Sequence, residues 1–159
     1  MAFGPGEGAG GAGSIERRVE LALPASVEFV RTARMVATSI GTVAGLDVAA
    51  LDDLRVGVDE ACAWLLLDAA GPTLWLDFTV GPGEVVARGG TKSDPDADPL
   101  FVDEETPASS FPEADGGGPG QLVALSEELL RVVTDRFRLE RGSSWSRFEL
   151  VKRRTAHGA

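Results

Sequence analysis

One stretch indicates the fold class of this chain most strongly: Leu51-Asp52-Asp53-Leu54-Arg55-Val56-Gly57-Val58-Asp59-Glu60-Ala61-Cys62-Ala63-Trp64. Its apolar residues recur every three or four positions, which is the spacing of one face of a helix. The positions expected to be buried are Leu51, Leu54, Val58, Ala61, Cys62 and Leu65. The pattern predicts a helix over residues 48–69 that packs through this face and is ended by Gly71-Pro72.

The segments before this helix predict one strand and one further helix. Residues 18–23 alternate between polar and apolar side chains, as a half-buried strand does, and Pro24 ends them. Ser26 is the expected N-cap of a helix that ends at Gly45. The core positions predicted for that helix are Phe29, Ala33, Val36, Ile40 and Val43.

The segments after it predict four strands and a third helix. Strands are expected at 73–80 and 84–87, joined by Gly81-Pro82-Gly83, then a helix at 121–134 and strands at 136–141 and 145–152. In the first of these strands, the even-numbered residues should face the helices and the odd-numbered ones the opposite side. The even-numbered set is Leu74, Leu76, Phe78 and Val80, and the odd-numbered set is Trp75, Asp77 and Thr79.

This order of elements predicts an α+β fold. We expect a two-layer sandwich in which three helices cover one face of a mainly antiparallel, mixed sheet. A chain of 159 residues suits a single domain, which we place at residues 15–153. The Gly-rich leader, 1–14, is expected to be disordered and the tail, 154–159, to fray. Residues 88–118 show no usable periodicity, so we expect a mobile, lid-like loop there.

The composition argues against several classes of function. The chain has 15 basic and 25 acidic residues, a formal net charge of −10, which disfavours direct binding to nucleic acid phosphates. The acidity suits a partner with basic surfaces, or it serves solubility alone. The sequence shows neither a membrane span nor a secretory signal, and it has one cysteine. These features predict a cytoplasmic protein that does not bind membranes.

Two groups of polar residues resemble parts of chemical sites. Asp94, Asp96, Asp98 and Glu105 imitate the acidic positions of a calcium loop, but Pro99 occupies the position that needs glycine. The single histidine, His157, has no partner for a metal site or a hydrolytic triad in the sequence around it. No metal site is predicted.

The stretch quoted above resembles the second helix of the anti-sigma-factor serine kinases, which belong to the GHKL superfamily with the Bergerat, or histidine-kinase-like ATPase, fold. In that family the helix carries a Glu and, four residues later on the same face, an Asn. The Glu orients the attacking hydroxyl and the Asn ligates magnesium on the nucleotide. Glu60 matches the Glu, whereas Trp64 occupies the position of the Asn. The resemblance covers residues 18–153 and includes the element order.

The other nucleotide-binding signatures of the family are also altered. The family reads adenine with an Asp after the third strand, but Val86-Ala87-Arg88-Gly89-Gly90-Thr91 has no Asp there. Gly118 and Gly120 resemble the glycine-rich phosphate box, with Pro119 between them. Trp64, Arg88, Gly90, Gly118 and Gly120 therefore mark a degenerate nucleotide site, and Glu60 would be catalytic only in an active kinase. An indole has no lone pair suited to magnesium.

The resemblance implies three alternative functions. The first is an anti-sigma factor without kinase activity, which sequesters a sigma factor and is released by a STAS-domain anti-anti-sigma factor, with no cofactor. The second is an active serine kinase that uses ATP and magnesium to phosphorylate that STAS-domain protein. The third is a regulator that kept the fold and binds an unrelated protein. The family also implies a homodimer.

Overall fold

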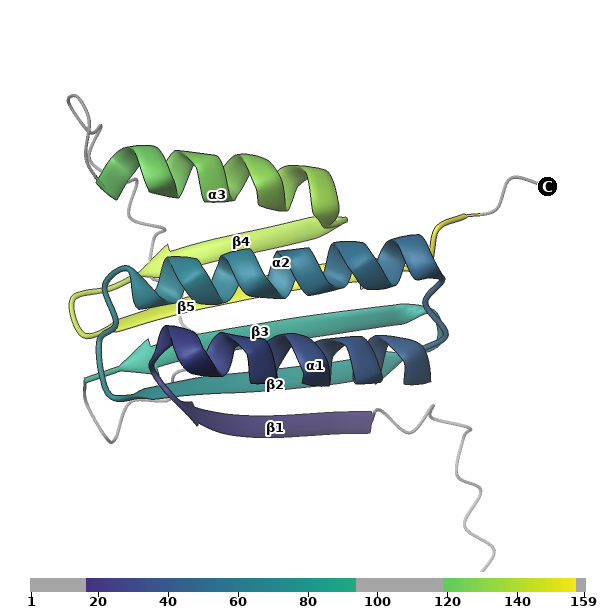
Figure 1. Ribbon diagram of the computed structural model, residues 1–159, viewed down its shortest axis with the longest axis horizontal. Coiled ribbons are helices and arrows are strands. Elements are labelled where there is room, and N and C mark those ends of the chain that lie inside the picture. Colours follow the sequence, from purple (N-terminus) through teal and green to yellow (C-terminus); the bar gives the residue numbers. More distant parts are fainter. Residues whose placement is uncertain (1–16, 94–118, 157–159) are drawn as a thin grey trace, which may run out of the picture.

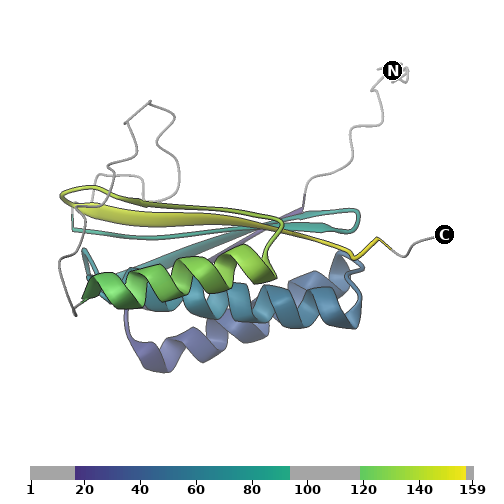
Figure 2. The same ribbon diagram turned by 90° about the horizontal axis from the view of Figure 1, so that it is seen from above.

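The computed structural model describes residues 17–93 and 119–156, and the side chains of residues 119–121 lie outside this description. Three helices lie side by side on one face of a five-stranded sheet (Figures 1 and 2). In chain order the elements are β1 (Arg17–Pro24), α1 (Val27–Val43), α2 (Val48–Leu66), β2 (Thr73–Gly81), β3 (Glu84–Lys92), α3 (Pro119–Val133), β4 (Arg136–Arg141) and β5 (Trp145–Arg153). The predicted α+β architecture and its three helices on one face are confirmed.

The sheet has the strand order β1-β2-β3-β5-β4. Each pair of neighbouring strands in it is antiparallel, so the expectation of a mixed sheet is wrong for the strands described. The reason lies in the connections, because β2 to β3 and β4 to β5 are hairpins and no crossover makes a parallel pair. Gly83, with φ +69°, supplies the left-handed residue of the β2–β3 turn.

The core lies between the helices and the sheet. Leu54, Val58, Ala61 and Leu65 of α2 are fully buried, as the helical spacing predicts. Every even-numbered residue from Leu74 to Val80 is also buried, so the predicted register of β2 is confirmed.

The predicted face of α1 needs a correction. Its buried positions are Val30, Ala33, Ala37, Ile40 and Gly41. Val43 is 57% exposed because the helix ends there, and Phe29 and Val36 only flank the core. Ser26 occupies the N-cap position without a side-chain hydrogen bond to the helix, and Gly45, with φ +77°, follows the C-cap. The core face is thus rotated toward α2 relative to the prediction.

Asp77 lies on the sheet face opposite the helices, as the alternation of β2 predicts, but it is enclosed by side chains of the neighbouring strands. Its side chain points away from the helices but is completely buried. Arg18 of β1 makes an ion pair with it, and Arg88 of β3 approaches to 3.7 Å. Two guanidinium groups from neighbouring strands therefore enclose the carboxylate, which the pattern of β2 alone does not reveal.

The expected loop over 88–118 begins too early, because β3 continues to Lys92. Gly89 and Gly90 weaken the strand signal in the sequence, since glycine has low strand propensity. The packing requires glycine here: a Cβ at Gly89 would lie 2.3 Å from Phe148 Cε1 and 2.8 Å from Leu76 Cδ2. Helix α2 is also shorter than predicted and ends at Leu66.

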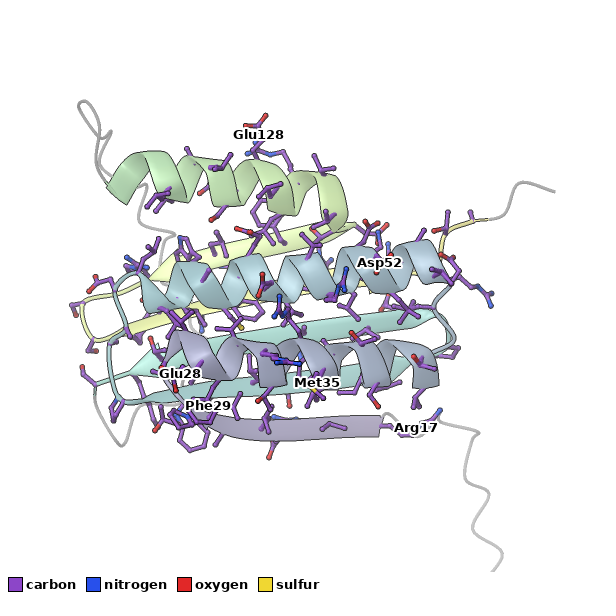
Figure 3. The ribbon with its side chains drawn as sticks, in the orientation of Figure 1. Arg17, Glu28, Phe29, Met35, Asp52 and Glu128 are labelled. Carbon is purple, nitrogen blue, oxygen red and sulfur yellow. The ribbon has the colours of Figure 1, made fainter. Side chains whose placement is uncertain are left out.

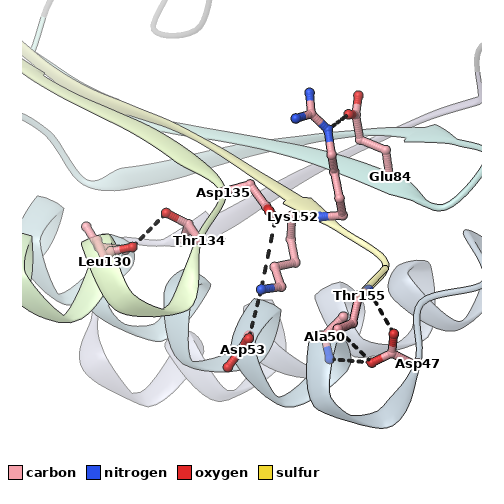
Figure 4. A network of polar contacts seen from close by, with 10 residues as sticks. Asp47, Ala50, Asp53, Glu84, Leu130, Thr134, Asp135, Lys152 and Thr155 are labelled. Atoms are coloured by element: carbon pink, nitrogen blue, oxygen red, sulfur yellow. Dashed lines mark hydrogen bonds and ion pairs between the residues drawn. The ribbon is translucent and has the colours of Figure 1, made fainter. Parts of the chain in front are cut away.

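The beginning of the expected frayed tail is tied to the domain (Figure 4). The backbone N–H of Arg154 donates to Gly83 O at 2.8 Å, and that of Thr155 donates to Asp47 Oδ2 at 2.9 Å. Lys152, inside β5, is buried and lies 2.8 Å from Asp53 Oδ2 and 3.9 Å from Asp135 Oδ2. The correction covers residues 154 and 155, which hold the end of β5 against the N-terminus of α2.

Some expectations fall on residues outside the described part of the chain. They are the disordered leader at 1–14, the loop beyond residue 93, Gly118 of the phosphate box, and the residues Asp94, Asp96, Asp98, Glu105 and His157. Across residues 17–93 and 119–156, no helix has the length and apolar character needed to cross a membrane.

Candidate functional site

Glu60 and Trp64 lie one turn apart in the second half of α2, where that helix packs against α3. Glu60 is partly exposed, and its Oε2 accepts a hydrogen bond from Ser126 Oγ of α3 at 3.3 Å. Ser126 is itself buried. The carboxylate that would be catalytic only in an active kinase therefore links two packed helices.

Trp64 is completely buried, and its environment is set by Arg141 at the end of β4. The guanidinium carbon of Arg141 lies 4.7 Å from the centre of the Trp64 ring. Arg141 Nη2 also donates a hydrogen bond of 3.2 Å to Trp64 O, and its Nη1 lies 3.6 Å from Asp68 Oδ2. The cation–π contact with the ring and the charge-assisted hydrogen bond to the backbone oxygen together hold the Arg141 guanidinium against Trp64.

The chemistry available at Glu60 and Trp64 is limited by the indole. It offers one N–H donor and no oxygen, whereas magnesium requires oxygen ligands in near-octahedral geometry. Trp64 is also 0% exposed, so its side chain packs within the protein and does not face an open site. In the described residues, no group of three or more His, Cys, Asp and Glu side chains is arranged to hold a metal ion.

Arg88 and Gly90 lie away from Glu60 and Trp64, on the sheet face that the helices leave open. Arg88 pairs with Asp77 in β2 and with Glu149 in β5, at 2.8 Å from Glu149 Oε2. Gly90 has Trp75 and Arg147 as its cross-strand neighbours. The structure therefore does not bring these two sequence-predicted residues together with Glu60.

The remaining predicted residue, Gly120, belongs to the first turn of α3. Its partner in the proposed phosphate box, Gly118, lies outside the described residues. Of the six predicted site residues, Glu60 and Trp64 thus lie together on α2, whereas Arg88 and Gly90 lie together on the opposite face of the sheet.

Sequence reasoning missed a groove between α1 and α2 on their solvent-facing side. It has a volume of about 580 Å³ and is lined by Arg31, Arg34, Met35, Thr38, Ser39, Leu51, Asp52 and Arg55. Figure 3 labels Met35 on α1 and Asp52 on α2, which mark its two sides. The sequence signal was the spacing of Arg31 and Arg34 on α1, but the contribution of Arg55 depends on how the two helices pack.

Cys62 has no catalytic environment. It is a fully buried residue of α2 and belongs to the hydrophobic core. Burial, and secondarily the negative charge of Asp59, raises the pKa of its thiol from 9.0 to about 12. Since the thiolate is the nucleophile, this cysteine is inert at neutral pH.

Comparison with known proteins leaves the family of this chain open. No protein-family model matches the sequence, and no curated protein matches it either.

Proposed function

We propose that this protein is an anti-sigma factor without kinase activity, built on a fold of the histidine-kinase-like ATPase type. It holds a sigma factor away from RNA polymerase, and a STAS-domain protein releases that sigma factor by competing for the same chain. The observation that carries the proposal is the burial of Trp64 beneath Arg141, at the position where the resemblance places a magnesium ligand.

The contacts around α2 support the absence of phosphate transfer. Kinase chemistry needs a metal bridging the phosphates and a carboxylate free to orient the hydroxyl. Here the residue at the ligand position is a buried indole, and Glu60 is engaged by Ser126. Arg88 belongs to the stretch that corresponds to the adenine-reading motif and lacks its Asp, and it is paired with Glu149 on the open sheet face.

The charge of the chain supports a basic protein as the sequestered partner. The net charge is −10, and complementary potentials accelerate and orient protein association. A sigma factor must contact DNA phosphates, so it presents basic surface that an acidic protein can cover. Covering that surface would block transcription stoichiometrically and without turnover.

In-vitro transcription with each sigma factor of the source cell tests the proposal. We expect one sigma factor to be inhibited at a stoichiometric amount of protein, and a STAS-domain partner to relieve the inhibition. Inhibition of none of them, together with no co-purifying sigma factor, would overturn it. Transfer of labelled phosphate from ATP to the STAS-domain partner, abolished by Glu60→Ala, would establish the kinase instead.

A further inference from the structure

The α1–α2 groove differs in charge from the rest of the chain. Three arginine side chains line it, although the formal net charge of the whole chain is −10. Arg34 and Arg55 each lie near an aspartate, at 3.5 Å from Asp59 and 3.3 Å from Asp52 respectively. Arg31 is exposed, and the structure gives it no ion pair within the described residues. The groove therefore retains positive charge.

The groove also contains apolar surface that is open to solvent. Met35 is 64% exposed, and Leu51 is partly buried on the facing helix. An exposed methionine is flexible and polarizable, and such residues adapt to an incoming apolar side chain. Thr38 and Ser39 also line the groove and add hydroxyl groups to it.

We infer that this groove binds a short acidic segment of a protein partner, with one apolar side chain against Met35 and carboxylates on Arg31 and Arg55. The lining residues on α1 run from Arg31 to Ser39, which is about 12 Å along a helix axis. A segment of two to three helical turns would match this length. The inference rests on the proposed function only in taking the occupant to be a protein.

A nucleic acid fits the groove less well than a peptide does. Asp52 lines it and Asp59 lies at its side, so a continuous row of phosphates would meet two carboxylates. The negative charge of the whole chain opposes a long polyanion further. A short acidic segment carries only a few carboxylates, which can lie at Arg31 and Arg55 and leave its neutral residues facing Asp52 and Asp59.

Selection from a displayed library of random peptides on the immobilised full-length protein tests this inference without a known partner. We expect the enriched peptides to be acidic with at least one large apolar residue. The strongest of them is then titrated by fluorescence anisotropy. Arg31→Glu with Arg55→Glu should weaken its binding by at least about tenfold, and Met35→Ala by severalfold.

The matched control is Arg131→Glu, the same charge reversal on the exposed surface of α3. It should change the affinity by no more than about twofold. Thermal melting of each variant must match the unaltered protein, since all these side chains are exposed or partly so. Raising the salt from about 0.05 M to about 0.3 M should weaken the binding.

Three outcomes would overturn the inference: enrichment of basic peptides, equal loss of binding in the Arg131→Glu control, or displacement of the peptide by single-stranded DNA of similar length. The transcription assay fails or succeeds independently. If acidic peptides bind in the groove but no sigma factor is inhibited, the proposed function is wrong and this inference stands. If a sigma factor is inhibited but the selected peptides show no preference for acidic residues, this inference is wrong and the proposed function stands.

Discussion

The guanidinium carbon of Arg141 lies 4.7 Å from the centre of the Trp64 ring, and Arg141 Nη2 donates to the backbone oxygen of the same residue at 3.2 Å. This contact joins the C-terminal half of α2 to the end of β4. It makes the indole part of the core rather than part of a solvent-facing site. The arrangement leads to predictions about both stability and nucleotide binding.

Arg141→Ala should destabilise the protein by about 1–3 kcal/mol, because it removes a cation–π contact and a charge-assisted hydrogen bond together. Urea unfolding measures the change. Arg131→Ala, on the exposed surface of α3, is the control and should cost no more than about 0.5 kcal/mol. Equal effects of the two substitutions would mean that the contact with Trp64 contributes nothing.

ATP with magnesium should leave the melting temperature nearly unchanged. A nucleotide at about a hundred times its dissociation constant would stabilise the fold by roughly 2.7 kcal/mol, which is at least several degrees for a domain of this size. Trp64→Asn should lower stability, because it removes a fully buried side chain, and it should still gain no nucleotide-dependent shift. A magnesium-dependent shift in the unaltered protein, lost in Glu60→Ala, would contradict this prediction.

The alkaline stability of the protein should depend on Cys62. Its thiol has a pKa of about 12 in the folded chain, against an ordinary value of 9.0. Above pH 9 the unfolded chain releases the proton while the folded chain keeps it, so stability falls as pH rises toward 12. The loss is at most about 1.4 kcal/mol per pH unit.

The measurement is urea unfolding of the unaltered protein and of Cys62→Ala at about pH 8 and about pH 10. The variant should be less stable at both values because of the cavity it creates. Its loss between the two pH values should be smaller by about 1 kcal/mol. Identical losses would show that the thiol is not the group that titrates.

The ion pair between Lys152 and Asp53 should contribute more to the free energy of unfolding than the exposed ion pair between Arg55 and Asp52. Lys152 is buried, and its Nζ lies 2.8 Å from Asp53 Oδ2 (Figure 4). Asp53→Ala should cost about 1–2 kcal/mol, a moderate value because Asp53 is partly exposed and Asp135 remains nearby. Asp52→Ala, which breaks an exposed pair with Arg55, should cost less than about 0.5 kcal/mol in the same unfolding experiment.

The parts of the fold that the sequence predicts are those with an uninterrupted local period. The apolar stripe of α2 and the even-numbered residues of β2 repeat with an uninterrupted period, and they are buried as predicted except for Leu51, which is only partly buried. The second half of β3 has no such signal, since Gly89 is required by Phe148, a residue distant in sequence. The burial of Asp77 likewise depends on arginines from two other strands.

The candidate site was predictable only where one helix supplies it. Glu60 and Trp64 share a face of α2, so their proximity follows from spacing alone. Arg141, which sets the environment of Trp64, comes from a strand that follows α3 along the chain. The α1–α2 groove requires the packing of two helices, which no single-segment pattern encodes.

We propose that the protein captures a sigma factor without using a nucleotide. This proposal is tested most directly by titrating each purified sigma factor of the source cell into the full-length chain, with and without ATP and magnesium, in a calorimeter. We expect one sigma factor to bind stoichiometrically, with the same dissociation constant in both conditions. Binding that requires ATP and magnesium, or no binding by any sigma factor, would contradict it.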